Sequence, residues 1–451
     1  MNLDRFFNAK RVAIIGVSKN PNKVGHVIFR NLMDSKYQGE IFIVNPNEKE
    51  ILGKHCYPSV LKIQEKIDMA VVAIPSEIIL KVVEECGKKR IKNLVIITAG
   101  FEESGNTKLK EDLLKLLKKY KINVIGPNCV GIFDANTQLD TIFLPRSRLK
   151  RPELGGISFV CQSGAVGSAI LDLATTEGYG FSKFISYGNA INVDESDIID
   201  YLAKDKQTKV ICLYTEGIKN GKKFIETAKK VSRKKPIIVV KGGITEEGKK
   251  ATLSHTGSLA GSAEIYFAAF KQAKVIHAET LEDMFNCARV LEKCVKPQGN
   301  RIQVITNGGG YGIMSTDAII KNNLKMAKMS SSTETLLKRN FPKIVTVANP
   351  IDLVGDATTE RYRISLGACL KDKNIDILLV VLLYQTPLIT PDVVDVVTEF
   401  NDLNKKPIIV VSTGGEFTQV LKNSLESNGV PCFTFPENAV KSIKKLTDYY
   451  L

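Results

Sequence analysis

Short apolar runs that alternate with segments of helical periodicity restrict most strongly what this chain can fold into. Five runs rich in valine and isoleucine occur early in the chain, at 11–17, 40–46, 68–75, 93–100 and 122–128. A strand followed by a helix is the repeating unit of a parallel sheet with helices on both faces. The sequence therefore predicts an α/β fold of doubly wound type.

The alternation is interrupted twice, which predicts three domains. A basic stretch with prolines at 144–156 and a second break at 294–300 are typical of linkers. We expect doubly wound domains at 1–145, 150–296 and 299–451. The second and third share a device, a strand that leads into a glycine-rich turn and then a helix.

Composition excludes several classes of protein. The longest apolar stretch, 375–384, includes Asp376 and is about half of the ~20 residues that a membrane-spanning helix needs. The first 17 residues lack the pattern of a secretory signal, so we expect a cytoplasmic protein. The nine cysteines are scattered and include no C-x-x-C pair, which favours reduced thiols over a disulfide framework or a zinc site.

The net charge of +15 has a local explanation. Basic runs such as 88–90, 118–119, 233–235 and 405–406 each precede an apolar strand, where a helix would end and its dipole favours cations. This placement favours a solvated surface or an anionic small molecule over nucleic acid.

The first domain has candidate ligand contacts at its strand ends. In an open α/β sheet the ligand lies beyond the carboxyl ends of the strands. The residues at these ends, and in the loop after the first strand, are Gly16, Ser18, Lys19, Lys23, Gly25, Asn45, Pro46, Ile74, Pro75, Ala99, Gly100 and Asn128. The alternative is that the glycines and prolines only form turns.

The same residues argue against NAD. No tight G-x-G-x-x-G follows the first strand, and the second strand ends in Asn45, where an NAD enzyme has an acid for the ribose. A basic loop with Lys19 and Lys23 suits a ligand with an additional phosphate. Coenzyme A, with its 3′-phosphate, meets this requirement.

One of the four histidines has an unusual context. His255 lies in the segment KKATLSHTGSLAGSAE, which we predict to be a loop before a helix that begins near Ser262. Hydroxyl groups and glycines around a histidine suit a covalent phosphohistidine intermediate. A lone histidine is otherwise usually a surface or hydrogen-bonded residue.

A phosphohistidine needs donors, and two predicted helix starts supply them. Ser163 and Gly164 begin one helix, and Gly309 and Gly310 begin the other, each directly after a strand. Glu216, at the end of the strand in 209–217, is the predicted carboxylate that orients the imidazole. The alternatives are plain strand-to-helix turns and a solvated loop acid.

Several motifs together resemble a known family. GVSKNPNKVG, GPNCVG, QSGAVG, YTEG and especially SHTGSLAG are similar to the α subunit of the NDP-forming acyl-CoA synthetases, relatives of succinyl-CoA synthetase. The third-domain segments NGGGYGIMSTD and NPIDLVGDATTE resemble the CoA-ligase domain that succinyl-CoA synthetase carries on its β subunit. The resemblance covers essentially the whole chain. It implies a Rossmann-like CoA-binding domain followed by two flavodoxin-like CoA-ligase domains.

The resemblance also implies a function. The expected reaction converts acyl-CoA, ADP and phosphate into a carboxylic acid, CoA and ATP, through an acyl phosphate and phosphorylated His255. Glu216 would steady the histidine, and the helices that begin at Ser163 and Gly309 would hold the phosphate. The acyl group, acetyl or another, cannot be identified from the sequence.

These enzymes need an ATP-grasp domain, and the three predicted domains occupy all 451 residues without a Walker-type phosphate loop. We therefore expect a separate ATP-grasp β subunit that carries ADP or ATP and Mg²⁺, in an α2β2 heterotetramer. No metal site is expected in this chain. The alternatives are a CoA-binding scaffold or regulatory protein without catalysis and, less well supported, an NAD-dependent oxidoreductase.

Overall fold

The computed structural model describes residues 2–256 and 262–451, without the side chains of 252–256. It confirms the α/β class, because the described residues form three mostly parallel sheets with helices packed on them. The chain divides into two compact units. Unit 1 contains residues 1–176 and 180–279, and unit 2 contains 177–179 and 280–451.

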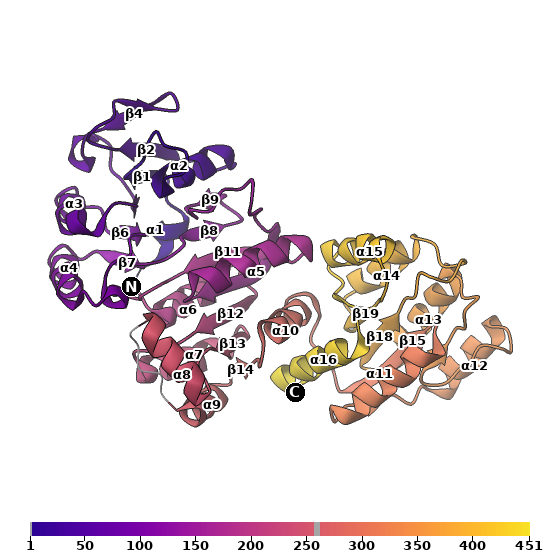
Figure 1. Ribbon diagram of the computed structural model, residues 1–451. Helices are drawn as coiled ribbons and strands as arrows, with labels where there is room; N and C mark the ends of the chain where they lie inside the picture. Colours follow the sequence, from indigo (N-terminus) through magenta and orange to yellow (C-terminus); the bar gives the residue numbers. More distant parts are fainter. Residues whose placement is uncertain (1, 257–261) are drawn as a thin grey trace. The chain divides into compact units, whose positions relative to one another are not determined.

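The first sheet of unit 1 has the strand order β3-β4-β2-β1-β5-β6-β7 and is parallel apart from the β3–β4 hairpin. From β4 to β7 this is the order of Rossmann folds, which reverses between β1 and β5. Helices α3 and α4 lie on one side of the sheet and α2 on the other (Figure 1). The elements are α1 (Asp4–Phe7), β1 (Arg11–Ile15), α2 (Val24–Asp34), β2 (Glu40–Val44), β3 (Glu50–Ile51), β4 (Lys54–Tyr57), η1 (Val60–Lys62), β5 (Met69–Val72), η2 (Ser76–Ile78), α3 (Ile79–Lys88), β6 (Asn93–Ile96), η3 (Glu102–Ser104), α4 (Thr107–Tyr120) and β7 (Asn123–Ile125).

The second sheet of unit 1 has the order β14-β13-β12-β10-β11-β8-β9. Its parallel part, β14 to β11, has the flavodoxin-like order, which reverses between β10 and β12. The elements are β8 (Ile132–Asp134), β9 (Leu139–Asp140), β10 (Leu154–Cys161), α5 (Gly164–Thr176), β11 (Phe181–Ser186), α6 (Glu195–Lys204), β12 (Val210–Thr215), α7 (Gly221–Val231), β13 (Ile237–Lys241), α8 (Glu246–Thr256), α9 (Ala263–Gln272) and β14 (Ile276–His277).

Strands β8 and β9 precede the predicted linker in the sequence but belong to the second sheet. They lie within the sequence range 1–145 that we predicted for the first domain, yet β8 pairs antiparallel with β11, with Phe133 opposite Phe184. Both strands are buried along their length. The second sheet therefore includes residues on the N-terminal side of the 144–156 stretch.

The two sheets of unit 1 share a hydrophobic core, because elements of both sheets pack on each other. Phe6 and Phe7 of the N-terminal helix α1 are buried, and the Phe7 ring stacks on Tyr201 of α6 with 4.9 Å between centroids. A single hydrophobic core contains residues from both sheets.

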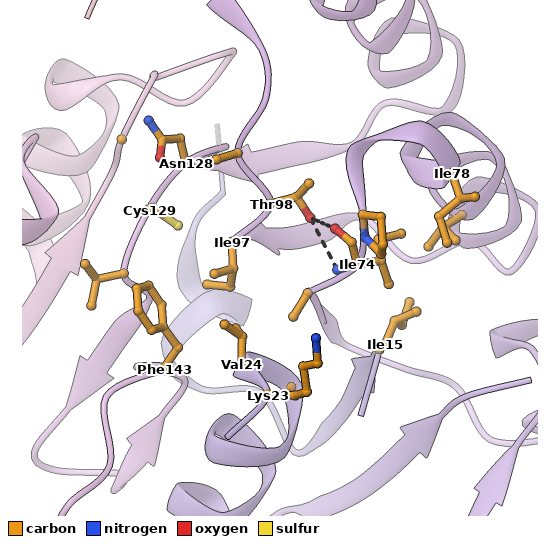
Figure 2. Close-up of a pocket in the computed structure, with 18 of the residues that line it drawn as sticks. Ile15, Lys23, Val24, Ile74, Ile78, Ile97, Thr98, Asn128, Cys129 and Phe143 are labelled. Atoms are coloured by element: carbon orange, nitrogen blue, oxygen red, sulfur yellow. Dashed lines mark hydrogen bonds between the residues drawn. The ribbon is translucent and has the colours of Figure 1, made fainter. Parts of the chain in front are cut away.

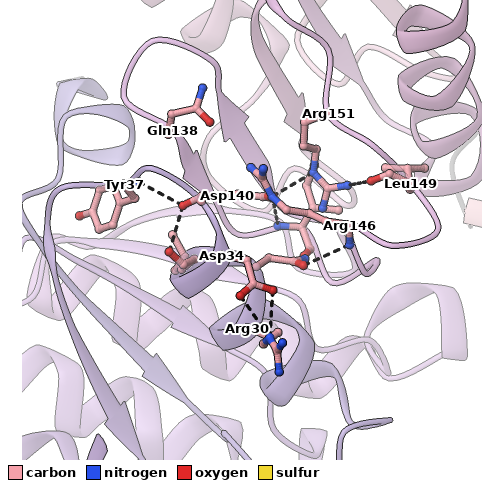
Figure 3. Close-up of polar contacts among 12 residues, drawn as sticks. Arg30, Asp34, Tyr37, Gln138, Asp140, Arg146, Leu149 and Arg151 are labelled. Carbon is pink, nitrogen blue, oxygen red and sulfur yellow. Dashed lines mark hydrogen bonds and ion pairs between the residues drawn. The ribbon is translucent and has the colours of Figure 1, made fainter. Parts of the chain in front are cut away.

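The segment after β9 is fixed by a buried ion-pair network (Figure 3). The fully buried Asp140 carboxylate accepts hydrogen bonds from Arg146 Nε at 2.8 Å and Arg151 Nε at 2.9 Å. On α2, Asn31 Nδ2 donates to the carbonyl oxygens of Ile142 and Leu144, at 2.7 and 3.0 Å. This segment is therefore held firmly against the first sheet's helix layer.

Unit 2 has a sheet of order β16-β15-β18-β19-β20, with β17 paired to β15, and this too is flavodoxin-like. Its elements are α10 (Leu281–Lys293), β15 (Arg301–Thr306), α11 (Gly309–Lys321), β16 (Lys325–Met326), α12 (Ser331–Asn340), β17 (Ile351–Asp352), α13 (Thr359–Lys371), β18 (Ile377–Val381), α14 (Val393–Asp402), β19 (Ile408–Val411), α15 (Glu416–Ser427), β20 (Cys432–Phe433) and α16 (Pro436–Tyr450).

Helix α10 belongs to unit 2, although its sequence lies in the range 150–296 predicted for the second domain. It packs against α16, and the buried Arg289 of α10 bonds to Glu426 of α15 at 2.8 Å. The Arg289 guanidinium also lies between the rings of Tyr179 and Phe433. These contacts explain why the helix packs with the C-terminal sheet.

Neither described range, 2–256 or 262–451, contains a helix that is long and apolar enough to cross a membrane. All nine cysteines are buried and none forms a disulfide.

Candidate functional site

A cavity of about 1210 Å³ in unit 1 is lined by residues that follow strands of both sheets. Figure 2 shows part of its wall, with Lys23, Ile74, Thr98, Asn128 and Phe143 around the open space. Most of the predicted site residues of unit 1 line it: Gly16, Ser18, Lys23, Gly25, Asn45, Pro46, Ile74, Pro75, Ala99, Asn128, Ser163, Gly164 and Glu216. The cavity therefore lies at the order reversals of both sheets, where ligands bind in such folds.

The turn after β1 is closely packed at two glycines. Gly16 has φ +100°, and a Cβ there would lie 2.1 Å from the carbonyl oxygen of Ala73. A Cβ on Gly25 would lie 2.1 Å from the carbonyl oxygen of Gly16. Only glycines allow β1, β5 and the start of α2 to approach this closely, and the N-terminus of α2 thereby reaches the cavity wall.

The lysines near this turn divide into two groups. Lys19 forms an ion pair with Glu48 at 2.7 Å and does not line the cavity. Lys23 lines it, and so does Lys81 of α3, which the sequence analysis missed. Neither Lys23 nor Lys81 has a carboxylate partner within the described part of the chain, so both amines are available to an anionic ligand.

Other predicted contacts shape the loops. Asn45 Nδ2 donates to the carbonyl oxygen of Val17 at 2.6 Å, which ties the end of β2 to the turn after β1. Gly100 does not line the cavity, and its N–H donates to Glu103 Oε1 at 2.6 Å. Thr98, which was not predicted, lines the cavity and donates to the carbonyl oxygen of Ile74 at 2.8 Å (Figure 2).

The start of α5 lies at the cavity wall. Ser163 precedes the helix and Gly164 begins it. A Cβ on Gly164 would lie 2.7 Å from Val130 Cγ2, so a larger residue would push against the opposite wall. Unpaired N–H groups and the helix dipole at such a start attract anions.

Gln162 joins this helix start to Glu216, and sequence reasoning did not single it out. Its Oε1 accepts hydrogen bonds from the backbone N–H groups of Glu216 and Gly217, at 2.7 and 3.2 Å. Thr215 Oγ1 and Tyr187 Oη also donate to it, at 3.2 and 3.4 Å. One side-chain oxygen therefore fixes the ends of β10 and β12 relative to each other.

Glu216 itself is 7% exposed and faces the cavity. Tyr214 Oη donates to its Oε1 at 3.4 Å, and Lys241 Nζ donates to its backbone oxygen at 2.9 Å. Lys241 is buried, and this burial lowers its pKa. The Glu216 carboxylate is thus held at the wall by its own strand end.

The prediction of a loop at His255 was wrong for the backbone. α8 continues through Thr256, because the segment from Glu246 onward begins with two acids in the first turn and contains good helix formers. His255 therefore lies in the last turn of α8, and its side chain falls outside the described residues. α8 contacts η3, whose Glu102 lines the cavity. The helix predicted near Ser262 is α9, with Ser262 at its N-cap.

The second predicted helix start belongs to unit 2. Gly309 and Gly310 begin α11 directly after β15, beside the order reversal of that sheet. Asp352 approaches this start, and its Oδ2 lies 3.0 Å from where a Cβ on Gly309 would be. Asn307 is anchored to the segment that follows β18, because its Oδ1 accepts the backbone N–H of Leu383 at 3.0 Å.

No group of three or more histidine, cysteine or acidic side chains suited to a metal ion occurs in the described part of the chain.

Comparison with known families matches each of the three sheets. A CoA binding domain matches residues 10–135, a succinyl-CoA ligase like flavodoxin domain matches 154–291, and a Ligase-CoA domain matches 302–443.

Comparison with individual proteins gives full-length similarity. The chain is 40% identical to acetate–CoA ligase (ADP-forming) II subunit alpha of Pyrococcus furiosus, covering 97% of this chain and 95% of the relative. It is 42% identical to acetate–CoA ligase (ADP-forming) of Methanocaldococcus jannaschii, where 98% of this chain spans 62% of the relative. A structure of dinucleotide-forming acetyl-coenzyme A synthetase 1 from Ca. Korarchaeum cryptofilum, in complex with phosphate and ADP, matches with a TM-score of 0.92 at 38% identity, over 99% of this chain and 97% of that one.

Proposed function

We propose that this chain, which belongs to the family of ADP-forming acetate–CoA ligases, is the α subunit of such an enzyme. The reaction is acyl-CoA + ADP + phosphate ⇌ carboxylic acid + CoA + ATP. The observation that carries the proposal is a cavity of unit 1 that joins the strand ends of a CoA-binding domain to Ser163 and Glu216.

CoA would occupy the part of the cavity formed by the first sheet. The wall there contains Gly16, Asn45 and Ile74 together with Lys23 and Lys81. Two ammonium groups suit the phosphates of CoA, which carries one phosphate more than dephospho-CoA. Calorimetry with the full chain tests this, and we expect Lys23→Met and Lys81→Met to weaken CoA binding more than dephospho-CoA binding. Equal binding of CoA and NAD would contradict the assignment.

The reacting groups would meet at the second sheet. A phosphate oxygen attacks the thioester carbonyl carbon, the C–S bond breaks, and CoA leaves as a thiolate that takes up a proton. His255 then attacks phosphorus, and the bond between phosphorus and the acyl oxygen breaks to release the carboxylate. The start of α5 supplies donors to the phosphoryl oxygens, and Glu216 stabilises the imidazole as its charge changes. We assign Gly309 and Gly310 of unit 2 to phosphate binding at a later stage.

The second half of the reaction needs a partner. We propose an ATP-grasp β subunit that binds ADP and Mg²⁺, in an α2β2 assembly in the cytoplasm. Two observations support the existence of a partner subunit: a similar protein from P. furiosus is named as a subunit alpha, and the M. jannaschii relative is longer than the match to this chain.

The decisive experiment separates the two half-reactions. We expect the purified chain to release CoA thiol from acetyl-CoA in a phosphate-dependent way, and to make ATP only when an ATP-grasp partner and Mg²⁺ are added. CoA binding without thiol release would indicate a CoA-binding scaffold. ATP formation by the chain alone would refute the division of labour.

A further inference from the structure

The cavity contains a lysine that the proposed steps leave unused. Lys219 lies in the loop between β12 and α7, three residues after Glu216, and lines the same cavity. The other cavity lysines, Lys23 and Lys81, belong to the first sheet's elements. Within the described residues, Lys219 is therefore the one lysine or arginine that the second sheet's elements contribute to the wall.

The position of the Lys219 amine is fixed by loops from both sheets. Its Nζ donates to the backbone oxygen of Asn189 at 2.8 Å. Asn189 is itself held, because its N–H donates to the carbonyl oxygen of Pro127 at 3.0 Å and its Nδ2 donates to Glu103 Oε2 at 2.5 Å. The amine is thus placed by a loop that is itself hydrogen-bonded to residues of the first sheet's loops.

This amine is not consumed by a close carboxylate. The carboxylate oxygen paired with it, Glu102 Oε2, is 3.7 Å away, and Glu102 already has a closer ion pair with Lys110. An ammonium group has three N–H donors; among the described residues one donates to Asn189 and a second faces Glu102 across the longer ion pair. One donor, and the positive charge, remain for a ligand in the cavity.

The negative charges expected beside Glu216 give a physical reason for a cation such as Lys219 in the cavity. A phosphate or acyl phosphate at the start of α5 carries about two negative charges and would lie beside the Glu216 carboxylate. Like charges in a partly dry site repel strongly, and a helix dipole of about half a charge cannot offset both. A cation in the same cavity would offset this repulsion. Lys219 is three residues from Glu216, and η3, which carries Glu102, also contacts α8, the helix that contains His255.

We propose that Lys219 binds the transferable phosphoryl group, first as inorganic phosphate and then as acyl phosphate. This assignment rests on the proposed function and names a residue for its phosphate subsite. Lys219 makes and breaks no covalent bond and remains protonated throughout. Its role is to place an N–H donor and a positive charge where Glu216 alone would repel the substrate.

The test uses the full chain and the first half-reaction, with saturating acetyl-CoA, varied inorganic phosphate and detection of released thiol. We expect Lys219→Met to raise the KM for phosphate by about ten- to a hundredfold, the range for loss of a charge-assisted hydrogen bond, with CoA affinity changed less than about twofold. Lys222→Met is the matched control, because Lys222 is exposed in the first turn of α7 and does not line the cavity.

A second variant separates charge from structure. Burial lowers the pKa of Lys219, against the effect of Glu102 and Glu195 and together with that of Lys110, so phosphate binding by the wild-type chain should weaken at alkaline pH. Arginine stays protonated, so Lys219→Arg should keep phosphate binding to a higher pH. A purely structural role would not move this profile.

The outcomes are distinct. No phosphate-dependent thiol release by the wild-type chain would refute the proposed function itself. Wild-type release together with an unchanged phosphate KM in Lys219→Met would refute the role of Lys219 alone. An equal rise in Lys222→Met would show a general charge effect and would also count against it.

Discussion

Glu195 allows a quantitative test of how a buried carboxyl group changes the pH dependence of the free energy of unfolding. It is the first residue of α6, is 2% exposed, and its Oε1 has no hydrogen-bond partner among the described residues. Burial is the main reason that its pKa rises from 4.5 to about 7; a backbone hydrogen bond and Lys223 oppose the rise, and Asp194 and Asp197 add to it. The folded protein therefore keeps a proton that the unfolded chain loses.

The sign and size of the effect follow from this difference. Between pH 4.5 and about 7 the folded state binds more protons than the unfolded state, so the contribution of Glu195 to the free energy of unfolding falls as pH rises through this window. A displacement of about 2.5 pH units corresponds to about 3 kcal/mol. Above pH 7 the loss is complete, and below pH 4.5 it is absent.

The variant Glu195→Gln removes the ionisation and keeps the shape of the side chain. We expect it to melt at a higher temperature than the wild-type chain at pH 8, with the difference shrinking toward pH 5, in calorimetric scans of the full chain. Glu226→Gln, at an exposed position of α7, is the control and should show no pH-dependent difference. A Glu195→Gln difference that is constant between pH 5 and 8, or that is destabilising at pH 8, would refute the reasoning.

Three further predictions follow from single contacts. Asp140→Asn should destabilise the chain by about 3 to 5 kcal/mol in chemical unfolding, because it leaves two arginines without their buried carboxylate. Asp34→Asn, in an exposed ion pair, should cost about 1 kcal/mol or less, and equal costs would contradict a stabilising role of the buried network. Gly16→Ala should weaken CoA binding and lower the melting temperature far more than Gly53→Ala, since both glycines have positive φ but of the two only Gly16 lacks space for a Cβ. Similar effects of the two variants would show that backbone strain alone matters. Gln162→Leu should slow phosphate-dependent thiol release by at least about tenfold with CoA affinity preserved, because it removes the acceptor that fixes the Glu216 loop. Gln162→Glu should slow the release less, and unchanged release in Gln162→Leu would rule out the positioning role of Gln162.

The part of the site that lies at strand ends could be predicted because it depends on periodicity. Parallel strands bring their carboxyl ends to one edge, so Gly16, Asn45 and Ile74 were found by recognising where apolar runs stop. Gln162 could not be found in this way, because its role depends on which strands are neighbours. β10 and β12 are adjacent only through the order reversal of the sheet.

Two other differences have physical causes. Lys19 and Lys23 look equivalent in sequence, but Lys19 forms an ion pair with Glu48, which follows β2, whereas Lys23 lines the cavity. Local composition around His255 suggested a loop, yet the residues from Glu246 favour a helix that continues to Thr256. Short-range composition alone therefore did not predict the backbone conformation of that segment.

Covalent phosphorylation of His255 is the central claim, and mass spectrometry of the full chain measures it directly. After incubation with acetyl-CoA and labelled inorganic phosphate at neutral or alkaline pH, where phosphohistidine survives, the label should lie on His255. Glu216→Gln should weaken the labelling, and His255→Ala should abolish both labelling and ATP synthesis with the partner. Label on another residue, or full activity in His255→Ala, would contradict the account.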